Sequence, residues 1–230
     1  MKTIGLIGGM SWESSAVYYA LINRMVRERL GGYHSAACVM VSVDFAAIQA
    51  HQARGEWTQA GEKLASAAGA LHRAGADCVV LCTNTMHKVA DAVQSAAPIP
   101  FIHIADATAQ AIQHAGLSRV GLLGTRFTMD EDFYKGRLTA THGLTVLLPE
   151  ADGREMVNRV IFDELVHGVI REGSRRDYLT QIDALAERGA EGVILGCTEI
   201  GLLVKAEHTA LPLFDTTAIH AGAAVDFALG

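Results

Sequence analysis

Short runs of apolar residues alternate along this chain with longer segments in which apolar residues recur every three or four positions. The runs at residues 3–7, 38–43 and 78–81 predict buried strands. A helix is predicted after Ser11, whose side chain suits an N-terminal cap, and a second helix over residues 57–74. Strands that alternate with helices of this length are typical of parallel β-α-β units, so the pattern predicts an α/β fold.

These predicted elements carry further expectations. The first helix has a broad apolar face made of two adjacent rows, Val17, Leu21 and Met25 in one and Tyr18, Ile22 and Val26 in the other. Gly75 is a suitable C-terminal stop for the second helix. After the second strand, a loop is predicted to run from Asp44 towards Gln52.

The second half of the chain repeats the first. Three blocks recur in the same order: residues 4–8 at 120–124, residues 75–81 at 189–195, and residues 99–101 at 211–213. The offsets are nearly constant, at 116 (120 − 4), 114 (189 − 75) and 112 (211 − 99) residues. Tyr18 also matches Tyr134 at the first of these offsets. The repeat predicts two homologous α/β lobes related by a pseudo-two-fold axis, each a parallel sheet flanked by helices.

Polar turns occupy matching positions in the two halves of the repeat. Thr83 and Cys197 are 114 residues apart (197 − 83), and each lies just past a predicted buried strand. Ligands bind at that end of the strands in open α/β sheets, so two facing lobes are expected to bring Thr83 and Cys197 to opposite sides of one active-site cleft. The turns at residues 8–11 and 124–128 also match, and each opens a predicted helix whose free N–H groups suit a carboxylate.

Composition narrows the class of protein. The chain has 230 residues and a mass of 24.5 kDa, with 50% hydrophobic and 19% charged residues and a mean hydropathy of +0.22, which excludes a disordered chain. Lys and Arg number 19 against 25 Asp and Glu, a formal net charge of −6 without a basic run. Nucleic acid and anionic membranes are therefore not expected as partners.

The cysteines and the N-terminal segment bear on location. The four cysteines, Cys38, Cys78, Cys82 and Cys197, are too few for a disulfide scaffold and show no Cys-x-x-Cys spacing. The apolar stretch at the N-terminus is too short for the hydrophobic region of a secretory leader. No stretch reaches the ~18 uninterrupted apolar residues that a membrane span needs. We expect reduced thiols and a cytoplasmic protein.

Several common ligand motifs are missing from the sequence. The turn at residues 5–9 lacks the Gly-x-Gly-x-x-Gly spacing of a dinucleotide site, and no P-loop motif occurs. The ten histidines show no His-Glu-x-x-His or other paired-ligand spacing, so no metal is proposed. No local motif supports a lysine-bound pyridoxal phosphate.

Cys197 and Thr83 each admit a structural and a chemical interpretation. A buried cysteine is usually inert. Cys197, however, lies in a strand-to-helix turn, where N–H groups are expected to favour the thiolate and to depress a pKa that starts near ~8.5. Thr83 is either a helix cap or a residue of the site opposite Cys197. Cys82 is one residue out of register in the repeat, so we interpret it as strand-end packing.

Further polar side chains near these turns stay open in role. His87 and Glu199 are candidates to carry protons for the thiol or the hydroxyl, although solvated surface roles are the norm for both residue types. Arg126 is a candidate to bind a substrate carboxylate, but an exposed salt bridge is the more frequent role of such an arginine.

Three blocks of sequence resemble a known family. Residues 8–13 (Gly-Gly-Met-Ser-Trp-Glu), 83–85 (Thr-Asn-Thr) and 196–199 (Gly-Cys-Thr-Glu) are similar to motifs of the cofactor-independent aspartate/glutamate racemase superfamily. The resemblance covers essentially the whole chain, including the two-lobe repeat. The last block looks like the aspartate racemase branch, whereas glutamate racemases usually carry His after Cys-Thr.

The resemblance implies a function and a site. It implies a racemase of L-aspartate, L-glutamate or both that works without a cofactor, commonly as a homodimer, by proton transfer at Cα. The implied acid/base residues are Thr83 and Cys197, with Cys197 as the base for the L-isomer. The residues implied to bind substrate are Met10, Gln52, Asn84, Thr85, Thr125, Thr128, Thr198 and Glu199.

The resemblance also implies where the chain passes between lobes. In this family the crossings lie near the positions of Pro100 and Pro212. Lobe 1 would then span residues 1–100 plus 212–230, and lobe 2 residues 101–211, so that the last helix returns to the first lobe.

One position departs from the family pattern. The first family motif is Cys-Asn-Thr, and Thr83 replaces its cysteine. Two alternatives to a racemase therefore stay open. One is a single-cysteine decarboxylase or isomerase of the same superfamily. Release of CO₂ would reveal a decarboxylase. The other is a non-catalytic amino-acid-binding module, which would bind without isotope exchange at Cα.

Overall fold

Two parallel four-stranded sheets with the same strand order organise the chain. The computed structural model describes all residues, 1–230. The strand orders are β2-β1-β3-β4 in the first sheet and β6-β5-β7-β8 in the second. The chain divides into two compact units, residues 1–104 with 220–230, and residues 105–219. The predicted α/β fold with two repeated lobes is confirmed, because each unit holds one sheet and the sheets share one topology.

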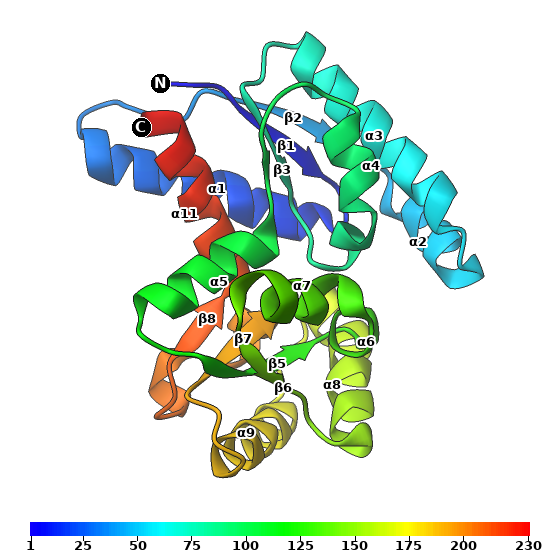
Figure 1. Cartoon of the computed structure of the whole chain (residues 1–230), viewed down its shortest axis with the longest axis vertical. Coiled ribbons are helices and arrows are strands. Elements are labelled where there is room, and N and C mark those ends of the chain that lie inside the picture. The colour runs from blue at the N-terminus through cyan, green and yellow to red at the C-terminus, as the bar shows by residue number, and fades with distance from the viewer. The chain divides into compact units, whose positions relative to one another are not determined.

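The first unit contains most of the elements predicted from the apolar pattern. In chain order, the elements of this unit up to residue 102 are β1 (Ile4–Gly8), α1 (Trp12–Leu30), β2 (Cys38–Ser42), α2 (Phe45–Arg54), α3 (Trp57–Arg73), β3 (Cys78–Leu81), the 3₁₀ helix η1 (Thr85–Val89), α4 (Ala90–Ser95) and β4 (Phe101–Ile102). Figure 1 shows α3 and α4 on one face of this sheet.

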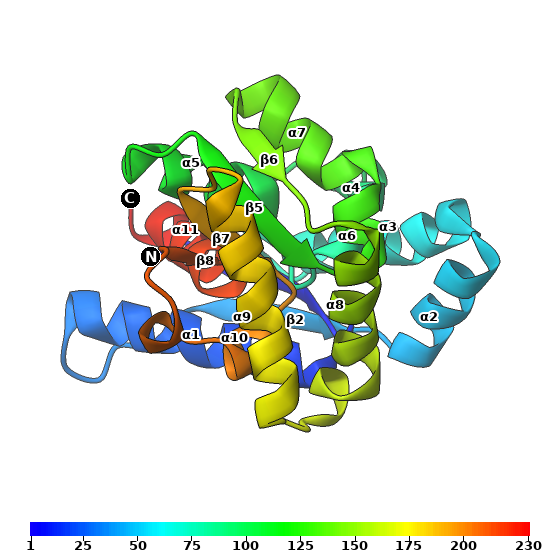
Figure 2. The same ribbon diagram turned by 90° about the horizontal axis from the view of Figure 1, so that it is seen from below.

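The second unit follows the same scheme. Its elements are α5 (Ile104–His114), β5 (Arg119–Gly124), α6 (Arg126–Asp130), α7 (Asp132–His142), β6 (Thr145–Leu147), α8 (Ala151–Asp163), η2 (Leu165–His167), α9 (Glu172–Glu187), β7 (Gly192–Gly196), α10 (Ile200–Leu203), η3 (Ala206–His208) and β8 (Leu213–Asp215). The last helix, α11 (Thr216–Leu229), starts in this unit and ends in the first. Both α8 and α9 pack against β5 and against each other (Figure 2).

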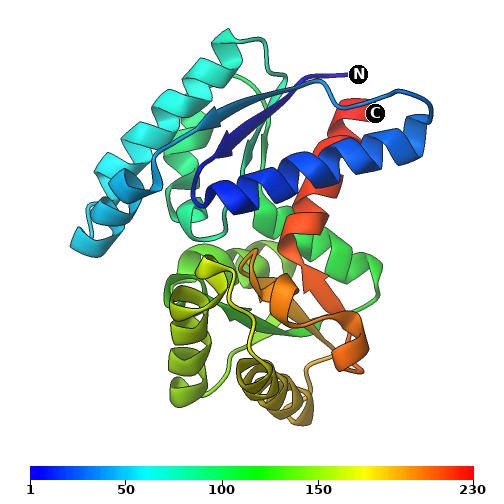
Figure 3. The same ribbon diagram turned by 180° about the vertical axis from the view of Figure 1, so that it is seen from behind.

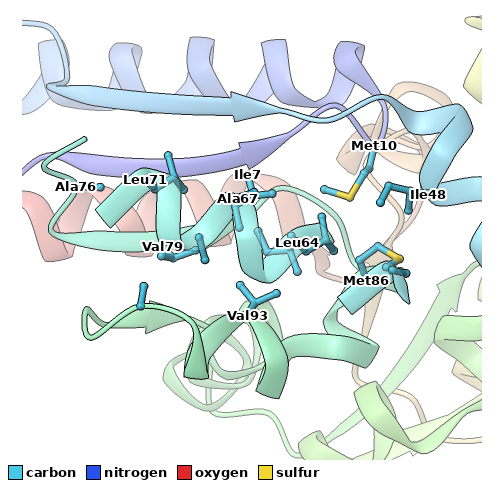
Figure 4. Close-up of a cluster of buried hydrophobic side chains, with 14 residues drawn as sticks. Ile7, Met10, Ile48, Leu64, Ala67, Leu71, Ala76, Val79, Met86 and Val93 are labelled. Atoms are coloured by element: carbon cyan, nitrogen blue, oxygen red, sulfur yellow. The ribbon is translucent and has the colours of Figure 1, made fainter. Parts of the chain in front are cut away.

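Side chains of β1 and β3 alternate between two cores on the two faces of the first sheet. Ile7 and Leu81 belong to a cluster with residues of α3 and α4. Figure 4 shows Ile7 in this cluster beside Leu64, which is fully buried. Ile4 and Val80 belong to a second cluster with α1 and α11, the helices that cross in Figure 3. Burial of each large aliphatic side chain contributes about 1.5–3 kcal/mol, so both faces of the sheet hold it in place.

The first helix follows its prediction in part. Ser11 caps α1 by accepting a hydrogen bond from the Ser14 N–H, as expected. The row Tyr18, Ile22 and Val26 is fully buried, but Val17 of the neighbouring row is 44% exposed. Leu21 and Met25 of that neighbouring row are partly buried and pack against the same core, so the predicted apolar face of α1 departs from the pattern only at Val17.

The prediction of a loop from Asp44 towards Gln52 is wrong. Residues 45–54 form α2, and the Asp44 side chain caps it by accepting a hydrogen bond from the Ala46 N–H. Apolar residues in this segment are mostly alanines, which have high helix propensity but give a weak periodic signal. The C-terminal stop at Gly75 is confirmed, since Gly75 directly follows the C-cap of α3 with a φ of +88°.

The divisions between units differ from the expected crossings near Pro100 and Pro212. They fall after Ile104 and after Ile219. The reason is strand pairing, since β4 pairs with β3 in the first sheet and β8 pairs with β7 in the second. Each sheet is completed by its last strand before the chain leaves the unit.

None of the helices is long and apolar enough to cross a membrane.

Candidate functional site

In each sheet the chain first connects the central strand to a neighbour on one side and then crosses to the other side. The candidate residues lie in the turns at this topological switch point. In the first unit β1 lies between β2 and β3, and in the second β5 lies between β6 and β7. Ligands of open parallel sheets bind beyond the carboxyl ends of the strands at such a switch. The turns after β1 and β3 contain Met10 and Thr83, and the turns after β5 and β7 contain Thr125 and Cys197.

The turn after β1 is fixed by a close backbone approach. Gly9 has a φ of +96°, and a Cβ on it would lie 2.1 Å from the Val43 carbonyl oxygen. The Gly9 N–H donates to Ser15 Oγ at 2.8 Å, and Ser15 Oγ donates to the Ser11 carbonyl at 2.9 Å. This turn therefore requires glycine and is tied to the start of α1. The sequence does not single out Ser15, because two adjacent serines at a helix start give no sign of which one supports the turn.

Met10 and Gln52 reach the same end of the first unit by different contacts. The Met10 side chain is buried in the cluster that also contains Ile48 and Met86, and Figure 4 shows these three at one end of it. Gln52, on α2, has its Nε2 2.9 Å from the sulfur of Met86, which lies in η1. The structure thus links α2 with the segment that carries Asn84 and Thr85.

Thr83 holds its backbone in place and leaves its hydroxyl available. Its N–H donates to the Leu81 carbonyl at 2.8 Å, and its carbonyl accepts from Nδ1 of His87 at 2.7 Å. The hydroxyl makes no hydrogen bond within the chain, and the residue is 9% exposed. The cap of η1 is Asn84, without a side-chain capping bond. The interpretation of Thr83 as a helix cap is therefore wrong.

The turn after β5 contains two hydrogen-bonded threonines. Thr125 caps α6 by accepting from the Thr128 N–H at 3.4 Å, and the two hydroxyl oxygens are 3.1 Å apart. Both residues are buried, at 6% and 0% exposed. They lie beside the second candidate turn, because Gly124 pairs with Gly196 in the sheet register.

The strand ends before Thr125 and Cys197 approach each other closely. A Cβ on Gly124 would lie 3.0 Å from the Gly196 carbonyl oxygen, and a Cβ on Gly196 would lie 3.0 Å from the Leu123 carbonyl oxygen. Side chains at these positions would push the two strands apart. The two glycines therefore set the spacing between Thr125 and Cys197.

The Cys197 thiol is hydrogen-bonded to a carboxylate. Its Sγ donates to Oε2 of Glu199 at 3.0 Å, and the Thr198 hydroxyl donates to the same oxygen at 2.6 Å. All three residues are half-buried. Thr198 and Cys197 thus both point at one carboxylate oxygen, which can accept the proton of the thiol.

The expected low pKa of Cys197 is wrong for this state of the protein. Burial raises the pKa of the thiol well above its ordinary value, and the charge and hydrogen bond of Glu199 raise it further. The N–H groups of Glu199 and Thr198 do lower the pKa, as the turn predicts, but they do not offset burial and the carboxylate. Cys197 is therefore a protonated thiol at neutral pH, with a neighbouring base.

Three other predictions have clear outcomes. Cys82 is fully buried and packs in the core between α1 and α11, as predicted, and burial raises its pKa far above the ordinary value. His87 is not a proton carrier in this structure, because both of its ring nitrogens bind backbone groups. The salt bridge expected for Arg126 is not formed, and its side chain is exposed.

No group of three or more His, Cys, Asp or Glu side chains is arranged to hold a metal ion.

Comparison with known proteins adds relatives over the full length of the chain. The family model described as Asp/Glu/Hydantoin racemase matches residues 7–224. A Yersinia pestis protein provisionally assigned as an Asp/Glu racemase has a crystal structure that is 53% identical, with a TM-score of 0.96 and full coverage of both chains. An aspartate racemase homologue from Pyrococcus horikoshii OT3 is 35% identical, with a TM-score of 0.88 and full coverage of both chains.

A curated relative matches over a shorter stretch. The broad specificity amino-acid racemase RacX of Bacillus subtilis (strain 168) is 23% identical over 155 residues. The match covers 64% of this chain and 63% of RacX, so it spans less than two thirds of that relative.

Proposed function

Because this chain belongs to the Asp/Glu/hydantoin racemase family, we propose that it is an amino-acid racemase that acts on L-aspartate, L-glutamate or both without a cofactor. The observation that carries the proposal is the repeat of one sheet topology with an acid/base candidate after the matching strand of each unit, Thr83 after β3 and Cys197 after β7. The names of the Yersinia and Pyrococcus relatives support the substrate class.

Racemisation needs two groups, one for each face of the substrate. Removal of the α-proton leaves a planar carbanion, and inversion requires that one group takes a proton from one face and another group returns a proton to the other. A duplicated α/β unit supplies one such group from each copy. In this proposal Cys197 serves the face from which the L-isomer loses its proton, and Thr83 serves the opposite face.

The thiol of Cys197 must lose its proton before it can act as a base. The thiol proton passes to Glu199 Oε2, to which Sγ already donates at 3.0 Å. The thiolate then takes the α-proton, and the electron pair of the broken C–H bond stays on the carbanion. Thr198 supports this transfer, because its hydroxyl bond to the same carboxylate oxygen orients Glu199.

Thr83 is the weaker partner. Its hydroxyl has no hydrogen bond within the chain and is therefore available to the substrate or to a water molecule that it orients. A hydroxyl is a much weaker acid than a thiol, so the step at this face is expected to limit the rate. The equilibrium constant of a racemisation is one, so a slow step at Thr83 lowers kcat/KM equally in both directions.

The substrate α-carboxylate requires donors near both groups. Backbone N–H groups around Asn84 and Thr85, and around Thr198 and Glu199, are proposed to hold the carboxylate and the charge that develops at Cα. Met10, Gln52, Thr125 and Thr128 are proposed to line the substrate site. Arg126, an exposed cation without an ion pair, is a further candidate to bind a carboxylate.

We also propose a homodimer in the cytoplasm. Apolar side chains are exposed along α1 and after it, including Trp12 (69%), Tyr19 and Tyr33. Exposed apolar side chains of this size are available to an association surface, and a second copy of the chain is the occupant that the family resemblance suggests. All four cysteines are free thiols, which is consistent with a reducing compartment.

A test of the proposal separates the two faces by substitution. Cys197→Ser is expected to abolish loss of the α-proton from the L-isomer, because a serine hydroxyl is too weak a base. CO₂ release from an α-substituted malonate in place of exchange would indicate a decarboxylase. Binding of L-aspartate or L-glutamate without exchange at Cα would indicate a binding module.

A further inference from the structure

His87 connects the turn of Thr83 to the end of the first unit. The residue lies in η1 and is 3% exposed, with Nδ1 2.7 Å from the Thr83 carbonyl oxygen and Nε2 3.2 Å from the Ile104 backbone nitrogen. Ile104 is the last residue of the first unit before the chain enters the second. One imidazole therefore joins the candidate acid/base turn to the segment through which the chain leaves the unit.

The two backbone partners fix the protonation of the ring. A carbonyl oxygen only accepts a hydrogen bond, so Nδ1 carries a proton. A backbone N–H only donates, so Nε2 is unprotonated. His87 is thus a neutral imidazole in the Nδ1–H form, and neither nitrogen is left to exchange a proton with substrate.

Aromatic and imidazole rings hold His87 from several sides. The centroid of His87 lies 4.6 Å from that of His103, 5.5 Å from that of Phe101 and 5.8 Å from that of His220. The ring of His220 is in turn held by Ile102, whose carbonyl oxygen is 2.6 Å from Nε2. The imidazole of His87 therefore has little freedom to rotate away from its two backbone bonds.

The position of the Thr83 hydroxyl depends on this arrangement. The backbone of Thr83 is held by two hydrogen bonds, one to Leu81 and one to His87, and its side chain has none within the chain. Loss of the bond to His87 would leave the Thr83 carbonyl free to turn, and the hydroxyl would move with it. A displacement of about 1 Å in a reacting group costs on the order of 100-fold in rate.

We propose that His87 is a positioning residue for the reaction, which aims the Thr83 hydroxyl at the substrate through its bond to the Thr83 carbonyl. This role rests on the proposed racemase function. It predicts that the half-reaction at the Thr83 face depends on the Nδ1 bond, whereas the half-reaction at Cys197 does not.

Two substitutions separate the two bonds of the ring. The side-chain amide of His87→Asn occupies the place of Nδ1 and can donate to Thr83, but it does not reach Ile104. The amide oxygen of His87→Gln occupies the place of Nε2 and can accept from Ile104, but it offers no donor to Thr83. The pair is matched in polarity, and each variant lacks one hydrogen bond that the other keeps.

The measured quantity is the ratio of inversion to exchange for L-aspartate or L-glutamate in D₂O. Deuterium incorporated with retention reports Cys197 alone, and appearance of the D-isomer requires the Thr83 face as well. The expected result is a drop of about 100-fold in this ratio for His87→Gln, with exchange itself within a few-fold of wild type. His87→Asn is expected to keep the wild-type ratio.

The outcomes distinguish this role from the function on which it rests. Wild-type protein that inverts its substrate, with an unchanged ratio in His87→Gln, overturns the positioning role alone. Wild-type protein that neither exchanges nor inverts overturns the proposed function and this role together. If His87→Gln does not fold, ¹⁵N NMR of the wild-type imidazole decides: the Nδ1–H tautomer that the two backbone bonds require is expected, and the Nε2–H tautomer overturns the proposal.

Discussion

The thiol of Cys197 donates a hydrogen bond to the carboxylate of Glu199 over 3.0 Å. The carboxylate raises the pKa of the thiol, on top of the larger rise caused by burial. The same carboxylate is the nearest group that can remove the thiol proton when substrate enters. One hydrogen bond therefore keeps the thiol protonated at rest and provides the base that activates it.

Substitution Glu199→Gln is expected to lower the pKa of Cys197, because it removes a negative charge that favours the protonated thiol and adds an amide N–H that can donate to the thiolate. The measurement is the rate of alkylation of Cys197 by iodoacetamide as a function of pH, followed by mass spectrometry of the peptide that contains it. The pH midpoint should move to lower values in the variant. Cys38, a half-buried thiol, is the control in the same sample and should keep its midpoint. A midpoint for Cys197 that stays the same or rises would contradict the account.

Substitution Thr83→Cys is expected to raise the rate of racemisation, by about tenfold or more, because a thiol is a much stronger acid than a hydroxyl. Both directions should gain equally in kcat/KM, since the equilibrium constant is one. The rate of D-isomer formation from the L-isomer, measured by chiral chromatography, checks this. Thr83→Val is the matched control: it preserves the shape of the side chain, removes the hydroxyl and should suppress inversion. An unchanged rate in Thr83→Cys would mean that the side chain has no part in proton transfer.

His220 is expected to make the folded state sensitive to acid. Burial lowers its pKa to about 4, against an ordinary value of 6.5, and its ring is bonded to Tyr18 and Ile102. Because the folded pKa lies below the unfolded one, the unfolded chain binds the proton first. Stability is therefore complete above about pH 6.5 and is lost as the pH falls towards about 4, by on the order of 3 kcal/mol.

Urea unfolding at about pH 7 and about pH 4.5 measures this loss. The control is His220→Gln, which has no titrating ring and whose amide can still donate to the Ile102 carbonyl. The variant should lose clearly less stability than wild type over the same pH interval. Equal losses in the two proteins would show that other groups cause the acid sensitivity.

Two glycines with positive φ should differ in their tolerance of alanine. Gly9 has a φ of +96° and backbone atoms of Val43 at 2.1 Å and 2.7 Å from an added Cβ, whereas Gly75 has a φ of +88° and no atom within 4 Å. Gly75→Ala should cost about 1–2 kcal/mol of unfolding free energy from the backbone conformation alone. Gly9→Ala should cost more than about 3 kcal/mol, because the turn after β1 must also open. Similar costs by urea unfolding would contradict the close approach at Gly9.

The internal repeat carries most of the structural information in the sequence. It predicts two sheets of one topology, because matching strands in the two halves are continuous apolar runs. Such runs are typical of parallel strands that helices cover on both faces, as is the case for β1 and β5 and for β3 and β7. The alanine-rich helix α2 gives no comparable signal, since alanine favours a helix without marking a face. Its capping residue, Asp44, stands in a segment with no apolar period.

The chemistry of the two turns is less accessible from sequence. The location of Cys197 after a strand is readable, but its pKa depends on how Glu199 folds back towards the sulfur, which no spacing rule gives. The tautomer of His87 follows in part from its hydrogen bond with Ile104, which is 17 residues away and contributes only a backbone N–H. Any residue type except proline offers such a group, so the sequence contains no signal for this hydrogen bond.

The central claim is that two groups act on opposite faces of one α-carbon. Incubation of the protein with L-aspartate and with L-glutamate in D₂O, followed by proton NMR and chiral chromatography, tests it most directly. The account predicts deuterium at Cα together with the D-isomer for at least one of the two substrates. Deuterium at Cα with complete retention of the L-configuration would contradict the two-group mechanism, and the absence of exchange with both substrates would contradict the assignment of this chain as an aspartate or glutamate racemase.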